Sequence, residues 1–480
     1  MASNTISLRV PDSLIVRHSD NCDVLPAYRT EFMRDRDRLM YATAFRRLAG
    51  KTQIYTVGSD DHRKNRLTHT LEVAQIARTI AAALDFDSNL AEAIALGHDF
   101  GHTPFGHAGE RMLHDIMIPD SNYIKNSPFY HKSKKEVRRQ FEREAHSSTY
   151  LDYAFGFKHN IQSVRVAASL EDSYQGKDGI NIGLNLTNFV LYGMMIHSKL
   201  DYGNGTILPN YYTQFDGRMK INGSTEYAWS FEAEIVRLSD DIAQWHHDLE
   251  DAMRDGVLPM SKICKTIAAS LDEAMDKKDK EKLDDFTGRT HMDRRSIAEL
   301  SHIVVNTLVN DLVEESNRKI TNIKDELTAK NIHDTNLIYT DYGNLGLSIV
   351  RDQIIGFSKK IKTNVFKNII KASIHHSRNV ERMNEKGKYI IRKLFEAYYS
   401  HPQQLPDGPI LHLLVETQAG NYKNIGEARD AGIGEARVAF NKLMENPTID
   451  VKCRLMRRIC DHIASMTDHY AIDEYNNLYG

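Results

Sequence analysis

The sequence predicts an all-α protein. Apolar residues recur at three- and four-residue steps along most of the chain, and no segment shows the sustained alternation typical of strands. We find no internal repeat and no low-complexity tract. A chain of 480 residues can bury a large core, as one big helical domain or two fused ones. The one expected exception is a minor β-hairpin in residues 203–225, which are rich in Gly, Asn and Tyr.

The first strong helical pattern covers Thr68–Leu84, where apolar residues follow three- and four-residue steps. Thr30–Leu48 shows similar spacing, whereas residues 1–30 are polar and should cover the surface. Asn89-Leu90-Ala91-Glu92 resembles a capping box and predicts the start of a helix that ends near Gly97. Pro104 suits a further helix start, which would place His107 and Glu110 one turn apart on the same face.

Later segments continue the helical pattern. Buried helices are predicted over Ser163–Leu170 and Leu184–Met195, and a long amphipathic helix over Phe231–Met253. The charged run Lys277–Lys282 predicts a solvated hinge. We expect the pairs His246-His247 and His375-His376 to lie on the surface.

Composition excludes several classes of protein. A formal net charge of −3 provides no overall attraction to nucleic acid or anionic membranes. The four cysteines form no CxxC pair, which argues against a disulfide framework or a thiolate zinc site and fits a reducing cytosol. We see no signal peptide at the N-terminus and no apolar run as long as a membrane span. We therefore expect a cytoplasmic protein without a membrane partner.

The stretch from His98 to Glu110 holds the residues best suited to chemistry. His98-Asp99 offers an imidazole nitrogen and a carboxylate oxygen, which borderline and harder divalent metals accept together. A catalytic metal commonly takes three or four protein ligands. The further candidates are His69, on the preceding helix, and either Asp240 or Asp241 in the long helix. Helical spacing does not choose between these two aspartates. One such residue alone carries little weight, but the ordered set on separate helices predicts a metal site.

These residues resemble the signature of the HD-domain metal-dependent phosphohydrolases. Blocks from about residue 29 to 478 look more closely like deoxynucleoside triphosphate triphosphohydrolases of the bacterial dGTPase type. The matching blocks are Arg34–Arg38, Phe45–Gln53, Arg66–His69, His98–Glu110, Gly183–Thr187, Asp240–Ala243 and Met466–Ala471. The resemblance implies an HD-domain helical fold over residues 31–275, with insertions at 120–146 and 203–225. Residues 276–480 would form a helical region that packs on this core and serves oligomerisation.

The resemblance also implies roles for individual residues. His69, His98, Asp99 and Asp240 would bind a divalent ion, for which we expect Mn²⁺ or Mg²⁺, with Co²⁺, Ni²⁺ or Fe²⁺ as alternatives. His107 would transfer a proton, and Glu110 would orient and charge-balance it. Other positions match residues around the nucleotide: Arg66 at the α-phosphate, Gln53 near the deoxyribose, His102 and His159 beside the phosphates, and Asp248.

Two positions depart from the pattern of this family. Gln244 stands where many members carry a tyrosine near the sugar 3′-hydroxyl, so recognition of the sugar is in question. Ile196 precedes His197 where many members have a lysine, so a phosphate contact is absent or shifted to Lys199.

The implied reaction is hydrolysis of a dNTP, with dGTP favoured, to deoxynucleoside and tripolyphosphate. The family further implies homo-oligomers, often hexamers, and a dNTP or single-stranded DNA effector. The basic run Lys132–Arg143 is interleaved with acidic residues, which favours a solvated helix face over a DNA site. Two alternatives remain. One is an HD phosphohydrolase acting on a nucleoside monophosphate or signalling nucleotide, and the other is a non-catalytic regulator that binds nucleic acid.

Overall fold

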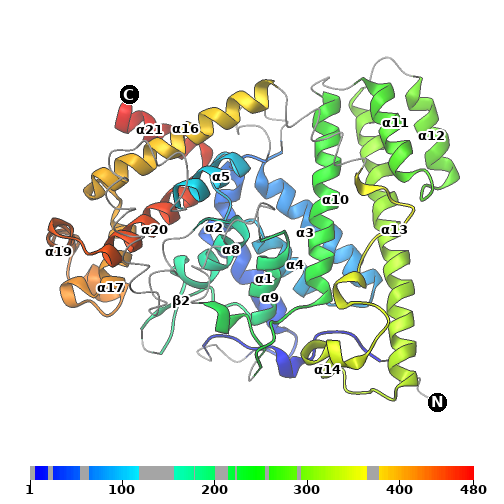
Figure 1. Cartoon of the computed structure of the whole chain (residues 1–480), viewed down its shortest axis with the longest axis horizontal. Helices are drawn as coiled ribbons and strands as arrows, with labels where there is room; N and C mark the ends of the chain where they lie inside the picture. The colour runs from blue at the N-terminus through cyan, green and yellow to red at the C-terminus, as the bar shows by residue number, and fades with distance from the viewer. Residues whose placement is uncertain are drawn as a thin grey trace.

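The computed structural model describes residues 6–19, 25–53, 64–117, 156–177, 179–200, 215–221, 224–254, 259–288, 293–364 and 378–480. Helices dominate these residues, which confirms the predicted fold class (Figure 1). Among the described helices, none has both the length and the apolar composition needed to cross a bilayer. The basic run Lys132–Arg143 and the pair His375-His376 lie outside the described residues.

A large hydrophobic cluster is built around three mutually packed helices, α3, α4 and α10. Its buried side chains are mainly Ala, Leu, Ile and Val, as expected where helices approach closely. The elements that contribute to it or border it are α1 (Glu31–Tyr41), α2 (Thr43–Arg47), α3 (Arg66–Ala83), α4 (Ser88–Gly97), α8 (His159–Arg165), α9 (Asn188–Ile196), α10 (Phe231–Arg254), α11 (Met260–Leu271), α12 (Lys277–Thr287), α13 (Arg294–Ala329) and α14 (Asn336–Thr340).

A second hydrophobic cluster lies on the other side of the molecule from α11, α12 and α13 (Figure 1). It joins one helix from the first quarter of the chain to the C-terminal helices. Its helices are α5 (Gly106–Met117), α16 (Arg378–Ser400), α17 (Asp407–Thr417), α18 (Ile425–Asp430), α19 (Ile433–Glu445), α20 (Ile449–Ser465) and α21 (Asp468–Tyr479). Consequently α5, which carries His107 and Glu110, packs against α16 rather than among the helices of the first cluster.

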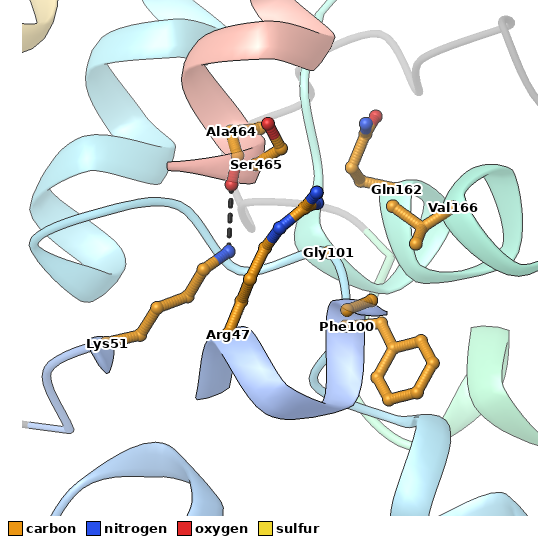
Figure 2. Close-up of a pocket in the computed structure, with 9 residues that line it drawn as sticks. Arg47, Lys51, Phe100, Gly101, Gln162, Val166, Ala464 and Ser465 are labelled. Atoms are coloured by element: carbon orange, nitrogen blue, oxygen red, sulfur yellow. Dashed lines mark hydrogen bonds between the residues drawn. The ribbon is translucent and has the colours of Figure 1, made fainter. Parts of the chain in front are cut away.

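Buried polar contacts tie the two clusters together. Lys51 Nζ donates to the carbonyl oxygens of His102 and Ala464, the latter at 2.8 Å, beside a small cavity (Figure 2). Burial, with Arg47 and Arg66 nearby, lowers the pKa of Lys51 to about 7. Asp468, at the start of α21, accepts a hydrogen bond from the backbone N–H of Phe105 at 2.9 Å. The C-terminal helices therefore hold the turn that precedes α5.

Several predicted helix starts were wrong by a few residues. The cap of α4 is Asp87, whose carboxylate accepts from the N–H groups of Asn89 and Leu90, so the expected capping box lies inside the helix. α5 begins at Gly106 rather than Pro104, because Phe105 and Gly106 have φ of 61° and 55°. The predicted Leu184–Met195 helix begins only at Asn188, after the cap residue Thr187.

One prediction about an irregular segment was wrong. The charged run at 277–282 is not a hinge: Asp276 caps Asp279 N and starts helix α12 there.

The hairpin expected in residues 203–225 stays a prediction for most of its length. Among the described residues, a two-stranded sheet joins β1 (Tyr174–Gln175) to β2 (Asn181–Gly183), ahead of that region. Residues 201–214 and 222–223 of that region lie outside the described residues, and an isolated bridge pairs Lys220 with Tyr227.

The proposed domain boundary near residue 275 stays a prediction.

The polar N-terminal segment contributes Leu8 and Val10 to the first cluster. In addition, Tyr339 Oη donates to the carbonyl of Leu8 at 2.6 Å. This segment is therefore anchored by buried side chains rather than lying only on the surface.

Candidate functional site

The four predicted metal ligands meet where α3, α4 and α10 pack together. His69 lies in the first turn of α3, His98 and Asp99 follow α4 directly, and Asp240 lies in α10. His69 Nε2 lies 2.9 Å from Asp240 Oδ1, and His98 Nε2 lies 3.4 Å from Asp99 Oδ1 and 3.9 Å from Asp240 Oδ1. The possible ligand atoms of His69, His98 and Asp99 all lie within 4.8 Å of one another. This spacing suits the coordination sphere of one divalent ion.

The hydrogen bond that His98 makes through Nδ1 leaves its other ring nitrogen available for a metal. Its Nδ1 lies 2.6 Å from the carbonyl oxygen of Ala95, which can only accept, so Nδ1 carries the proton. The Nε2 lone pair then points toward the three other candidate ligands. That nitrogen is fully buried and has no hydrogen-bond partner among the described residues. Because an unsatisfied buried acceptor is costly, a metal ion at this position would satisfy it.

Asp99 is surrounded by positive and hydrogen-bonding groups. Arg66 Nη1 donates to Asp99 Oδ2 at 2.7 Å, and His102 Nε2 lies 3.0 Å from Asp99 Oδ1. Burial alone would raise the pKa of Asp99, but His98, His102 and Arg66 together lower it well below its usual range. The carboxylate is therefore ionised at neutral pH, as a metal ligand must be.

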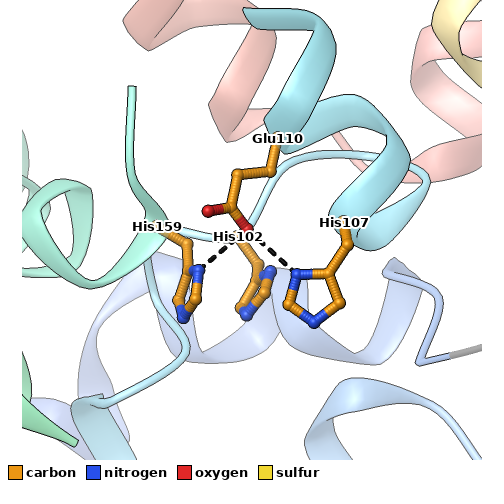
Figure 3. Close-up of side chains that lie close together, drawn as sticks. All are labelled: His102, His107, Glu110 and His159. Carbon is orange, nitrogen blue, oxygen red and sulfur yellow. Dashed lines mark hydrogen bonds and ion pairs between the residues drawn. The ribbon is translucent and has the colours of Figure 1, made fainter. Parts of the chain in front are cut away.

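A second group of side chains converges on Glu110 (Figure 3). Glu110 Oε2 lies 3.0 Å from His107 Nδ1 and 2.9 Å from His159 Nδ1, while Lys158 Nζ lies 3.1 Å from Oε1. Burial would raise the pKa of Glu110, but its two histidine partners lower it well below its usual range. An ionised carboxylate accepts, so each histidine donates its Nδ1 proton to Glu110 and keeps a basic Nε2 when neutral.

His107 is the member of this group that reaches solvent. Its side chain is 61% exposed, whereas that of Glu110 is 1% exposed. His102 stacks on His159 with 3.9 Å between ring centroids, and the His107 ring meets the His102 ring edge-on at 5.3 Å. The exposed imidazole, anchored by a buried carboxylate, is the arrangement expected of a proton-transferring group.

A further buried histidine, His197, directly follows α9 and lies next to His159. His159 Nε2 lies 3.3 Å from His197 Nε2, and His197 Nδ1 donates to the carbonyl of Met194 at 2.7 Å. Burial, with His98 and His159 nearby, lowers the pKa of His197 to about 3, so this imidazole is neutral. The possible ligand atoms of Asp99, His159 and His197 also lie within 4.8 Å of one another, so a cation or a substrate group could bridge them.

Three of the predicted substrate-binding residues, Gln53, Gln244 and Asp248, form a hydrogen-bonded row. Gln53 Nε2 donates to Gln244 Oε1 at 2.7 Å, and Gln244 Nε2 donates to Asp248 Oδ1 at 2.8 Å. Burial raises the pKa of Asp248 to about 7. Gln244, at the position where many family members carry a tyrosine, thus connects Gln53 to Asp248.

Three residues next to the cluster were missed or misjudged from the sequence. Lys158 was not singled out, although it directly precedes His159. Glu72 was also missed, although it lies one turn after His69 on α3. The expectation of a surface position for His247 was wrong: it is 2% exposed and contacts both His69 and Glu72.

Comparison with known proteins agrees with this geometry. Residues 66–154 match the model of the HD domain, and residues 355–418 and 438–477 match that of the phosphohydrolase-associated domain. The chain is 30% identical over 462 residues to a "deoxyguanosinetriphosphate triphosphohydrolase-like protein" of Bartonella henselae, covering 95% of this chain and 91% of the relative. A protein of the same name from Brucella suis is 32% identical over 465 residues, with 94% and 90% covered.

The chain belongs to the deoxyguanosinetriphosphate triphosphohydrolase-like family. It is accordingly an HD-domain phosphohydrolase, a class that binds divalent metals. His69, His98 and Asp99 fall within the matched HD-domain residues, whereas Asp240 lies beyond them and joins the cluster through α10. The His, Asp and Glu side chains gathered here fit the metal that this class requires.

Proposed function

We propose that this protein is a metal-dependent dNTP triphosphohydrolase that cleaves dGTP to deoxyguanosine and tripolyphosphate. The observation that carries the proposal is the juxtaposition of two groups. His69, His98, Asp99 and Asp240 form a cluster able to hold a metal, and the exposed His107 lies beside it, anchored on Glu110. The names of the relatives support the nucleotide substrate.

When bound, a divalent ion would polarise a phosphate oxygen and lower the pKa of a water molecule. The four clustered side chains would hold that ion. Arg66 would bind the α-phosphate through its fork of donors, since its buried Nε has no hydrogen-bond partner among the described residues. His102, His159 and His197 line the same region, and we propose that they contact phosphate oxygens.

Proton transfer falls to His107. Its Nδ1 is committed to Glu110, which leaves Nε2 on the exposed side of the ring to exchange a proton with the reacting group. Glu110 would stabilise the imidazolium that forms and fix the ring orientation. Lys158 and His159 would keep Glu110 ionised through the cycle.

Gln53, Gln244 and Asp248 would contact the deoxyribose. A glutamine at 244 offers an amide where a tyrosine would offer a ring and hydroxyl, so rejection of a ribose 2′-hydroxyl should be weaker. We further propose a homo-oligomer, with a hexamer as the leading form, and a nucleotide or single-stranded DNA effector, as the family resemblance implies.

The deciding experiment is an assay of purified protein with Mn²⁺ or Mg²⁺ and each of the four dNTPs and GTP, with products separated by chromatography. We expect deoxynucleoside and tripolyphosphate from dGTP, and no turnover by Asp99→Ala. Release of orthophosphate would instead support a different nucleotide phosphohydrolase. Turnover of GTP as well would point to Gln244, and Gln244→Tyr should then restore the preference for dGTP.

If none of the five nucleotides reacts, the assay is repeated with mixed dNTPs and with single-stranded DNA to test for an effector. Binding of nucleic acid that falls steeply with salt, unaffected by His107→Ala, would favour the non-catalytic alternative. Sedimentation of the same preparation measures the oligomeric state.

A further inference from the structure

A second row of polar side chains lies behind the metal-ligand cluster, on the side of His69 that faces away from Asp240. His69 Nδ1 lies 3.4 Å from His247 Nδ1, and His247 Nε2 contacts the carboxylate of Glu72. His247 is 2% exposed, whereas the Glu72 side chain is 35% exposed. These contacts connect a candidate metal ligand to a carboxylate at the rim of the helices.

The helix pair that supplies the ligands also supplies this row. Glu72 follows His69 by three residues on α3, and His247 follows Asp240 by seven residues on α10. Both spacings keep the two residues of each pair on one helical face. Each of the two helices therefore carries one candidate metal ligand and one residue of the second row on the face that it turns toward the other helix.

The hydrogen-bond pattern permits one protonation state when His69 binds a metal through Nε2. His69 must then carry its proton on Nδ1 and donate it to His247 Nδ1, which must accept. A neutral His247 that accepts at Nδ1 carries its own proton on Nε2 and donates it to Glu72. We infer that Glu72 and His247 form a relay that fixes the tautomer and orientation of His69 for metal binding.

Glu72, His246 and His247 could instead hold an ion themselves, because their possible ligand atoms lie within 4.8 Å of one another. Two observations oppose it. Lys64 Nζ already lies 3.0 Å from Glu72 and 3.2 Å from His246 Nε2, where a cation would sit. Moreover, an ion on His247 Nε2 would force its proton onto Nδ1, and His69 would then have to accept there and lose its Nε2 lone pair.

Two substitutions of His247 distinguish a hydrogen-bonding role from a packing role. His247→Gln retains an acceptor toward His69 and a donor toward Glu72, whereas His247→Leu has a similar size and neither group. The matched control is His246→Leu, since His246 lies beside His247 but makes no hydrogen bond to His69: its Nδ1 lies 3.0 Å from the carbonyl of Ala243. Glu72→Ala tests the outer end at a half-exposed position where a change should not disturb the fold.

The inference rests on the proposed metal site, but its test needs no nucleotide. Mn²⁺ is titrated calorimetrically into metal-free protein and its variants, each first checked by thermal unfolding without metal. Loss of a supporting hydrogen bond typically weakens metal binding 10- to 100-fold. We expect about that loss for His247→Leu, a smaller loss for Glu72→Ala, and near-normal affinity for His247→Gln and His246→Leu.

Three results would overturn the relay: unchanged affinity in His247→Leu, equal losses in His247→Gln and His247→Leu, or two bound Mn²⁺ per chain with one lost in His246→Leu. The last result would establish the second ion instead. Failure of the proposed function is distinguishable, because a protein that turns over no dNTP can still show the expected pattern of Mn²⁺ affinities.

Discussion

Glu110 is the residue on which the candidate proton-transfer group depends. It is buried, yet it contacts two histidines and a lysine, and their positive or proton-donating groups offset the cost of desolvating its charge. Of these partners only His107 projects to solvent. In the proposed mechanism, Glu110 therefore positions the proton-transferring His107 rather than transferring a proton itself.

We predict that His107→Ala lowers kcat for dGTP by about 10²- to 10⁴-fold, the usual contribution of general acid–base catalysis. Glu110→Gln should cost less, since the glutamine can still contact the ring but cannot stabilise its positive charge. Mn²⁺ affinity should change in neither variant, and the exposed His333→Ala is the control for kcat. Normal turnover by His107→Ala would assign proton transfer to another group.

The sequence predicted this pair, and the family resemblance placed His159 beside the phosphates, but neither predicted that His159 contacts Glu110. Spacing alone puts His107 and Glu110 on one face of α5. By contrast, His159 lies 49 residues from Glu110 in the chain, and only the packing of α8 beside α5 brings it to 2.9 Å. The wrong prediction for His247 has a related cause, because a pair of histidines in a helix does not reveal which neighbouring helix covers it.

At the scale of elements, the loop that carries two of the candidate metal ligands, His98 and Asp99, is held by α8. Gly101 N donates to Ser163 Oγ at 2.9 Å, and Ser163 Oγ donates to the carbonyl of His98 at 2.7 Å. A Cβ on Gly101 would lie 2.1 Å from the carbonyl oxygen of His159 and 2.3 Å from Ser163 N. Only glycine allows α8 to approach this closely.

We predict that Gly101→Ala destabilises the protein by about 3 kcal/mol, the upper range for overpacking, because both clashes are with backbone that cannot rotate away. It should also weaken Mn²⁺ binding by shifting Asp99. Urea unfolding measures the first effect. Gly408→Ala, in α17 with open space around it, is the matched control and should be neutral or slightly stabilising. Equal stability of both variants would contradict the close approach.

The first turn of α10 carries a buried acid with a pH-dependent contribution to stability. Glu232 is fully buried, its Oε1 accepts from Asp87 N at 3.0 Å, and burial raises its pKa to about 7. Between the ordinary carboxyl pKa and about 7, the folded protein thus keeps a proton that the unfolded chain has released. Stability from this group is full at acid pH and is lost as the pH rises through that window.

We therefore expect Glu232→Gln to flatten the dependence of unfolding free energy on pH between about 5 and 8. The variant should gain stability relative to the original protein as the pH rises. Urea titrations at four pH values in that range measure both slopes. Parallel slopes would show that Glu232 ionises normally in the folded state.

Element positions followed well from the sequence, but their ends did not. The apolar spacing of Thr68–Leu84 and Phe231–Met253 predicts α3 and α10 to within about two residues of their bounds. α4 starts after its cap residue Asp87. α5 starts after the left-handed turn at Phe105, whose backbone N–H is held by Asp468. That contact comes from the far end of the chain, and no local pattern reveals it.

On the scale of the whole molecule, the two hydrophobic clusters share the candidate site. The metal-ligand cluster belongs to helices of the first, and His107 with Glu110 belongs to α5 in the second. The proposed proton transfer therefore requires that the relative position of the two clusters be held to a fraction of an ångström. The sequence could not show how, because the connecting contacts join residues that lie 296 to 413 positions apart in the chain.

One of these connections is the buried ion pair of Arg165, the last residue of α8, with Asp461 in α20. Arg165 Nη2 lies 2.7 Å from Asp461 Oδ2, and the two side chains are 1% and 6% exposed. We predict that Asp461→Ala destabilises the protein by about 3–5 kcal/mol, because it removes the carboxylate that neutralises a buried guanidinium. The pair Arg437–Asp407, with side chains 39% and 50% exposed, is the control, and Asp407→Ala should cost about 1 kcal/mol or less.

The same variant tests whether the two clusters unfold together. If the Arg165–Asp461 pair couples them, calorimetry of Asp461→Ala should resolve two transitions, or one broadened transition at lower temperature, where the original protein shows one. Activity should fall more than Mn²⁺ affinity, since the ligand cluster is complete within the first cluster while His107 is not. A single sharp transition with activity and metal affinity reduced in parallel would mean that the pair stabilises the fold as a whole, without positioning α5.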